Sequence, residues 1–241
     1  MFALWRNPWQ VLRAASARQR GLIVALGVVL GVMNSIFYLA IARLPLATVG
    51  AIEFVGPVLL AAWGARTPRN VLALAAAVFG VVLLTDARWA FEPIGLVLAF
   101  ANCALFMAYV VLGHRLAEDG GATGIDRLGA AMAVAAVVAL PIGLPDALPA
   151  FRSPGLLAAA IGVGVCSSVI PYVCDQLAMA RLPRATFSLM LALLPATATL
   201  IGVLVLQQIP SVSELAGIVV IAVAVGVHQP AEKPKPAGAA G

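Results

Sequence analysis

Residues 39–48 read LAIARLPLAT and residues 177–186 read LAMARLPRAT, so eight of ten positions are identical across a spacing of 138 residues. Each copy joins the end of one apolar run to the start of the next. Nine residues after the last Thr of each copy, Pro57 and Pro195 interrupt the following apolar run. An internal repeat in a membrane chain is typical of secondary transporters. The repeat therefore predicts two related helical units and a transport function.

The composition indicates that lipid is the solvent of this chain. Hydrophobic residues make up 63% of the 241 residues, charged residues only 10%, and the mean hydropathy is +1.05. A soluble domain keeps about a quarter of its residues charged. The net charge of +5 comes from basic residues scattered between apolar runs rather than gathered on one stripe, so nucleic acid is not an expected partner. We expect an all-α, polytopic membrane helix bundle without a separate soluble domain.

Eight apolar runs stand out, most of them near the length of about 17–25 residues that spans a bilayer. They are residues 21–42, 46–63, 70–85, 93–113, 128–144, 155–180, 185–206 and 212–227. The runs at 70–85 and 128–144 are short, and we expect them to gain a turn from their flanks or to lie in locally thinned lipid.

The basic residues predict the orientation of these spans. With a cytoplasmic N-terminus, twelve Lys and Arg residues lie on the cytoplasmic side, and only Arg43, Arg88 and Arg152 lie outside. Cytoplasmic loops carry such an excess of positive charge. Eight spans then place both termini in the cytoplasm.

Combined with these spans, the repeat is shifted by five helices. Because five is odd, the related helices cross the membrane in opposite directions and the repeat is inverted. We expect four segments along the chain. These are a basic cytoplasmic segment (1–20), a first and incomplete repeat (21–85), a second repeat (93–228) and a disordered cytoplasmic tail (229–241).

Glu53 is the strongest candidate for a transport residue. It lies seven residues into its span, roughly 10 Å below the membrane face. A carboxylate at that depth costs at least about 2.5 kcal/mol, and intramembrane acids usually mark ion or substrate pathways. It can carry a proton between the two sides, or it can serve as a protonated link between helices. Its repeat equivalent is Leu191, so the site is asymmetric.

Asp175 is the second candidate, five residues before the cytoplasmic end of its span. It can bind a cationic substrate group or a coupling proton. Alternatively, it can extend to the interface or pair with Arg181 or Arg184.

Further candidates are polar or aromatic residues at helical spacing. Asn34 and Tyr38 lie one turn apart on one span, and Asn102 and Tyr109 share a face of another. They can line a path for a small zwitterion or link helices by hydrogen bonds. The paired prolines Pro57 and Pro195 predict a hinge or a broken-helix site near the midplane.

Gly27 and Gly31 form a GxxxG spacing, which indicates close helix packing within the chain or in a homodimer. His114 and His228 have no partner at ligand spacing, and soluble-enzyme motifs are absent. We therefore expect no metal, no cofactor, no catalytic residues and no enzyme activity.

Two segments carry a resemblance to a known family. MNSIFYLAIARLPLATVGAIEFVGP (33–57) and SSVIPYVCDQLAMARLPRATFSLMLALLPA (167–196) resemble the EamA-type branch of the drug/metabolite transporter superfamily, near its threonine/homoserine exporters. The resemblance implies a ten-helix inner-membrane carrier of two inverted five-helix repeats that exports small metabolites, with protons in exchange. It also implies an acidic position at Glu53 and another at Asp175. Against this pattern the chain lacks the first two helices, as a natural eight-span form or through a late start.

We therefore expect a secondary exporter of a small metabolite, an amino acid such as threonine or homoserine or an analogue. Proton antiport and alternating access between the two repeats would drive it. Two alternatives stay open: a membrane subunit that does not itself transport, and a membrane-embedded transferase.

Overall fold

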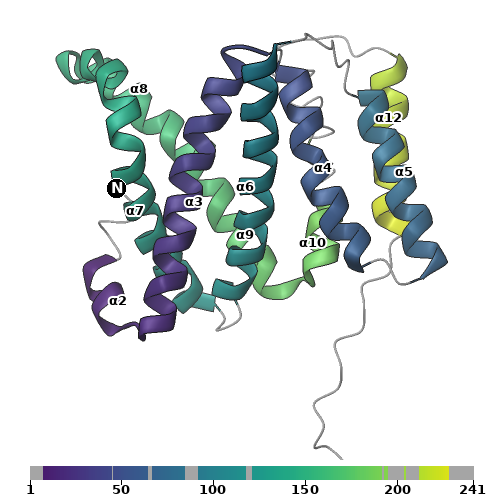
Figure 1. Ribbon diagram of the computed structural model, residues 1–241, viewed down its shortest axis with the longest axis horizontal. Helices are drawn as coiled ribbons and strands as arrows, with labels where there is room; N and C mark the ends of the chain where they lie inside the picture. Colours follow the sequence, from purple (N-terminus) through teal and green to yellow (C-terminus); the bar gives the residue numbers. More distant parts are fainter. Residues whose placement is uncertain are drawn as a thin grey trace, which may run out of the picture.

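The computed structural model of the protein describes residues 8–44, 46–64, 67–84, 92–117, 121–191, 193–194, 204 and 212–227. These residues form helices joined by short turns, without a strand among them (Figure 1). In chain order, the elements are α2 (Pro8–Ala14), α3 (Ala17–Ile41), α4 (Leu46–Gly64), α5 (Pro68–Leu84), α6 (Pro93–Ala117), α7 (Gly121–Ala147), η1 (Leu148–Arg152), α8 (Pro154–Gly164), η2 (Val165–Val169), α9 (Ile170–Arg181), α10 (Arg184–Met190) and α12 (Val212–Val227).

Each of the eight predicted apolar runs contains a described helix, so the predicted helical bundle is confirmed. Among the described residues, four continuous stretches are long and apolar enough to cross a membrane: Ala17–Ile41, Pro93–Ala117, Gly124–Pro145 and Pro154–Arg181. The run at 128–144 does gain turns from its flanks, because α7 extends over 27 residues. The run at 70–85 gains only two residues at its start and forms the 17-residue helix α5.

The two copies of the repeated decapeptide lie at opposite ends of the bundle. The first copy forms the connection from α3 to α4 at the upper end of Figure 1, and the second connects α9 to α10 at the lower end. Helices that correspond in the repeat therefore run in opposite directions, as the inverted repeat predicts.

Corresponding helices also pack against each other. α5 packs against α12 and α4 packs against α10. A Cβ atom on Gly80 of α5 would lie only 3.0 Å from the carbonyl oxygen of Gly217 in α12. At the lower end, Arg69 Nε donates to the carbonyl oxygen of Val227 at 2.7 Å. The α5–α12 pair is thus a close antiparallel contact between equivalent helices.

The two glycines of the GxxxG spacing in α3 pack against another helix of the same chain. A Cβ on Gly27 would lie 2.5 Å from the carbonyl oxygen of Ala131, and one on Gly31 would lie 2.9 Å from that of Ala135, both in α7. Without side chains at these two positions, α3 and α7 approach backbone to backbone. Of the two predicted uses of this motif, packing within the chain is the one observed.

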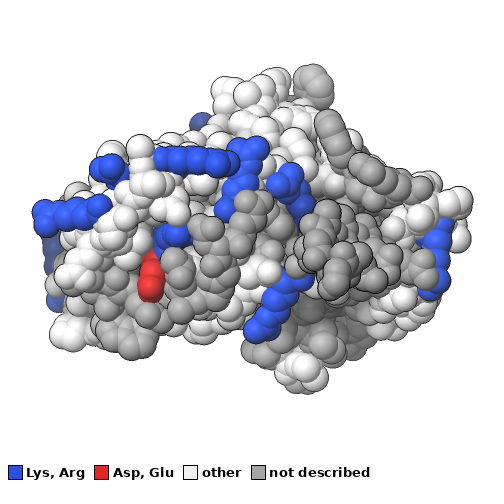
Figure 2. Space-filling model, turned by 90° about the horizontal axis from the view of Figure 1, so that it is seen from below, with Lys and Arg blue, Asp and Glu red and all other residues white. Residues whose placement is uncertain are grey.

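Positive charge gathers at the lower end of the bundle, which Figure 2 shows from below. Eight described arginines belong to helix ends or turns at that end: Arg13, Arg18, Arg20, Arg69, Arg115, Arg127, Arg181 and Arg184. Arg43 and Arg152 belong to the α3–α4 connection and to η1, at the opposite end. This division agrees with the predicted sidedness of the loops.

Candidate functional site

Asn102 and Tyr109 are two of the buried polar side chains of helix α6. Asn102 is fully buried and Tyr109 is 2% exposed. They are seven residues apart, which is two helical turns or roughly 10 Å along the axis. Each of them forms a hydrogen bond to one of the two predicted acidic residues, so both acids of the site contact α6.

The upper pair joins α4 to α6. Asn102 Nδ2 donates a hydrogen bond to Glu53 Oε1 at 3.1 Å. Asn102 Oδ1 is also buried, and it has no hydrogen-bond partner among the described residues. Pro57 follows Glu53 by one turn inside α4 and is buried. Because proline has no N–H, it cannot bond to the backbone carbonyl of residue i−4, which here is Glu53.

The lower pair joins α6 to α9. The Tyr109 hydroxyl donates to Asp175 Oδ2 at 2.8 Å. Asp175 is half-buried, so its carboxyl group faces the bundle. This geometry fits the prediction that Asp175 binds a substrate group or a proton inside the bundle. Among the described residues, Asp175 forms no ion pair with Arg181 or Arg184.

A third contact lies between α3 and α9. Asn34 Nδ2 donates to the Tyr172 hydroxyl at 2.9 Å and to the backbone carbonyl of Leu30 at 2.8 Å. The Tyr172 ring meets the Tyr109 ring edge-on, with the centroids 5.6 Å apart. Tyr172 therefore connects the Asn34 contact to the lower acidic pair.

Asn102 and Tyr109 hold these contacts two turns apart along α6, and we call the whole set the polar column. The column consists of six residues from four helices: Asn34, Glu53, Asn102, Tyr109, Tyr172 and Asp175.

Five of the eight predicted site residues meet in this column, and three do not. Tyr38 is 64% exposed; its ring packs edge-on against Phe37, and it makes no hydrogen bond to a described residue. Pro57 lies one turn from Glu53 without belonging to the hydrogen-bond network. Pro195 lies outside the described residues, so the predicted paired hinge cannot be followed in the second copy.

Tyr172 was missed as a site residue, although the sequence holds a signal for it. Tyr172 and Asn34 are 138 residues apart, which is the repeat spacing. Equivalent positions of an inverted repeat meet where the symmetry axis passes. Two polar residues at equivalent positions in spans are therefore candidates for a contact at the centre.

The backbone of the span that carries Asp175 is irregular above the acid. η2 (Val165–Val169) is a π-helical segment, with the Ile170 N–H bonded to the Val165 carbonyl oxygen. Such insertions in a helix are frequent at functional sites. Among the described residues, no group of three His, Cys, Asp or Glu side chains could hold a metal ion.

The fold and the column define a multi-pass membrane protein with hydrogen-bonded carboxyl groups inside its helix bundle. Residues 93–227 match the EamA-like transporter family. Together with the relatives described next, this match shows that the chain belongs to the EamA-like transporter family.

Two of its relatives are bacterial proteins described as threonine/homoserine exporter RhtA. The protein of Salmonella typhimurium strain SL1344 is 32% identical over 225 residues, which cover 91% of this chain and 74% of the relative. The protein of Escherichia coli strain K12 is 32% identical over 206 residues, covering 84% and 68%. A solved crystal structure, 18% identical, covers 94% of this chain and 91% of its own, with a TM-score of 0.62. That likeness concerns the fold alone.

Proposed function

We propose that this protein exports a small amino acid, threonine, homoserine or an analogue, across the cytoplasmic membrane in exchange for protons. Family membership makes it a membrane transporter, and the names of its relatives favour the amino-acid substrate. The proposal places the basic end of the bundle in the cytoplasm, in agreement with the excess of arginines there.

One observation carries the proton-coupling part of the proposal. Each acid of the polar column has a neutral hydrogen-bond donor as its partner: Asn102 for Glu53 and Tyr109 for Asp175. Neither acid forms an ion pair with a described residue. An amide and a phenol can each bond to a carboxylate or to a carboxylic acid, because both groups can donate and accept. These partners therefore support a carboxyl group that takes up and releases a proton.

The column also contains residues of both copies of the repeat, as a site for alternating access requires. Asn34 and Glu53 belong to the first copy of the repeat, and Tyr172 and Asp175 belong to the second. Rocking one copy against the other would change the distances between these groups. A proton or substrate bound at the column would then favour one of the two arrangements.

The test is efflux from loaded membrane vesicles under an imposed proton gradient, with Glu53→Gln as the variant. Gln keeps an oxygen that can accept from Asn102 but cannot exchange a proton, so we expect proton-driven efflux to be lost while insertion is kept. The matched control is Glu92→Gln, at the start of α6, where the Glu92 side chain accepts from the Gly95 N–H. Efflux that stays proton-driven in the Glu53→Gln variant would remove Glu53 from the mechanism.

A further inference from the structure

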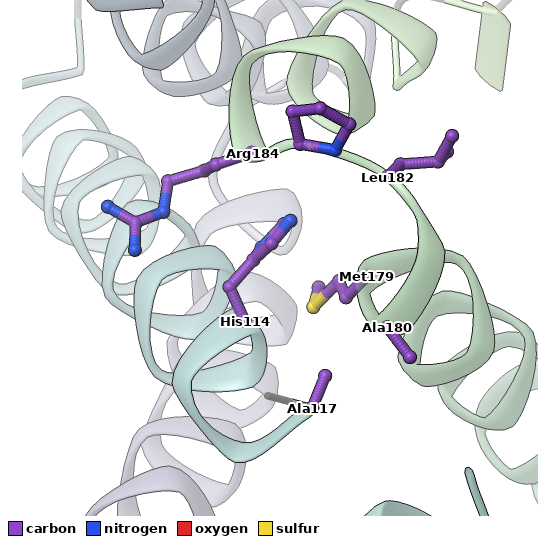
Figure 3. Close-up of a pocket in the computed structure, with 7 residues that line it drawn as sticks. His114, Ala117, Met179, Ala180, Leu182 and Arg184 are labelled. Carbon is purple, nitrogen blue, oxygen red and sulfur yellow. The ribbon is translucent and has the colours of Figure 1, made fainter. Parts of the chain in front are cut away.

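A pocket with a volume of about 340 Å³ lies at the lower end of the bundle, away from the polar column. The end of α6, the end of α9 and the start of α10 enclose it. Figure 3 shows His114 of α6 and Met179 of α9 pointing into the gap beneath the α9–α10 turn. Arg184 extends from the start of α10 on the side of His114. This volume lies at the lower end of the range of small-molecule sites.

Two of the residues that line this pocket are the two positions at which the repeated decapeptides differ. The first copy has Ile41 and Leu46, and the second has Met179 and Arg184 in their places. The eight unchanged positions suffice to build the corner in both copies. The two changes give the second corner a flexible thioether and a second guanidinium group, beside the arginine that both corners share.

The chemistry of the pocket wall favours an anionic group attached to a short apolar body. Arg184 is exposed and forms no ion pair with a described residue, and its planar guanidinium suits bidentate bonding to a carboxylate. Ala117, Met179 and Pro183 supply apolar surface in the same lining.

His114 is a fixed part of the wall. It is 8% exposed, its Nδ1 lies 2.9 Å from the Val110 carbonyl oxygen, and its ring meets the Phe187 ring edge-on. The pocket therefore has one rigid side on α6 and one adjustable cationic side on α10.

From these features we infer that this pocket is an entry subsite, in which Arg184 binds the carboxylate of the substrate before it reaches the polar column. The inference deepens the proposed function and rests on it for the identity of the substrate. The pocket opens at the arginine-rich end, where the positive potential favours a zwitterion that approaches with its carboxylate first.

The variant Arg184→Leu places in the second corner the residue that the first copy has at this position. Uptake into inside-out vesicles, which exposes the basic end to the medium, is measured with L-threonine and with L-threoninamide, which has no carboxylate. Because Arg184 is exposed, its ion pair with the carboxylate is screened, and the apparent KM for L-threonine should rise about fivefold with little change in the maximal rate. L-threoninamide should show no such change.

Two control variants accompany it. Arg184→Lys keeps the charge and should restore much of the affinity. Arg115→Leu removes an exposed cation next to His114 that does not line the pocket, and it should leave KM unchanged. An unchanged KM for L-threonine in Arg184→Leu, or equal losses for L-threonine and L-threoninamide, would overturn the inference.

Equilibrium binding separates the subsite from the transport function. Labelled L-threonine is dialysed against the full chain in lipid nanodiscs, with and without Arg184→Leu. Binding that Arg184→Leu abolishes would support the subsite even if the vesicles showed no flux, in which case the proposed function alone would fail. No binding to the unaltered chain, or equal binding to both, would reject the subsite.

Discussion

Asn34 and Tyr172 occupy the same position in the two copies of the repeat, and they bond directly to each other at 2.9 Å. In an inverted pair, a residue meets its own equivalent only where the pseudo-two-fold axis passes. In the repeat, position 80 corresponds to position 218, and Gly80 contacts Gly217, the residue next to it. This contact is therefore a second point on the axis. The axis therefore runs from the α3–α9 contact to the α5–α12 crossing, and the polar column lies across it.

The Asn34–Tyr172 bond should couple the two copies energetically. We expect the single variants Asn34→Leu and Tyr172→Phe to destabilise the protein, and the double variant to cost less than their sum. The coupling should be about 0.6 kcal/mol and at most about 1.7 kcal/mol, the range of interhelical hydrogen bonds in membranes. Thermal unfolding of the four proteins in nanodiscs measures it. Tyr38→Phe is the matched control, because that hydroxyl has no bond to a described residue; strictly additive effects would contradict the coupling.

The spans and the direction of the repeat could be predicted from the sequence because they depend on local and one-dimensional signals. Apolar length predicts a spanning helix, and charge asymmetry predicts its direction. The odd shift of five helices then requires the two ARLP corners to lie at opposite ends, which is the arrangement observed in Figure 1.

The partners of the site residues could not be predicted in this way. Asp175 and Arg181 are close in sequence, but six residues on a helix turn through about 600°, which places the two side chains about 120° apart. Asp175 therefore meets Tyr109 on another helix. Likewise, Asn34 and Tyr38 are one turn apart, yet of the two only the Asn34 side chain forms a hydrogen bond to a described residue, the Tyr172 hydroxyl of α9.

The contact of α3 with α7 should tolerate no added methyl group. Gly27→Ala places a Cβ about 2.5 Å from the Ala131 carbonyl oxygen and 2.6 Å from Val134 Cβ. We expect a loss of about 1–3 kcal/mol of stability, the usual cost of overpacking, measured as a lower melting temperature in nanodiscs. Gly21→Ala in the same helix is the control, since a Cβ there meets nothing within 4 Å. Similar melting temperatures for the two variants would show that α3 and α7 are not in close contact.

The two corners should be reached from opposite sides of the membrane. In a background without Cys103, Cys166 and Cys174, we expect Arg43→Cys to react with an impermeant maleimide from outside and Arg181→Cys only after permeabilisation. Arg152→Cys should behave like Arg43→Cys, since η1 lies at the same end of the bundle as the α3–α4 connection. Labelling of both corners from one side would exclude the inverted repeat, whatever the substrate.

Tyr109 should matter through its hydroxyl rather than through its ring. Tyr109→Phe keeps the ring contacts with Phe106 and Tyr172 but removes the donor to Asp175. Leaving a partly buried carboxyl without its partner costs about 1–3 kcal/mol, so we expect both a lower melting temperature and slower efflux. In an Asp175→Asn background, no carboxyl group loses its hydrogen-bond donor when the Tyr109 hydroxyl is removed. The same change should therefore lower the melting temperature and the efflux rate less. If Tyr109→Phe costs as much in that background, its effect comes from packing around the ring, and the lower pair would have no claim to a role in proton exchange.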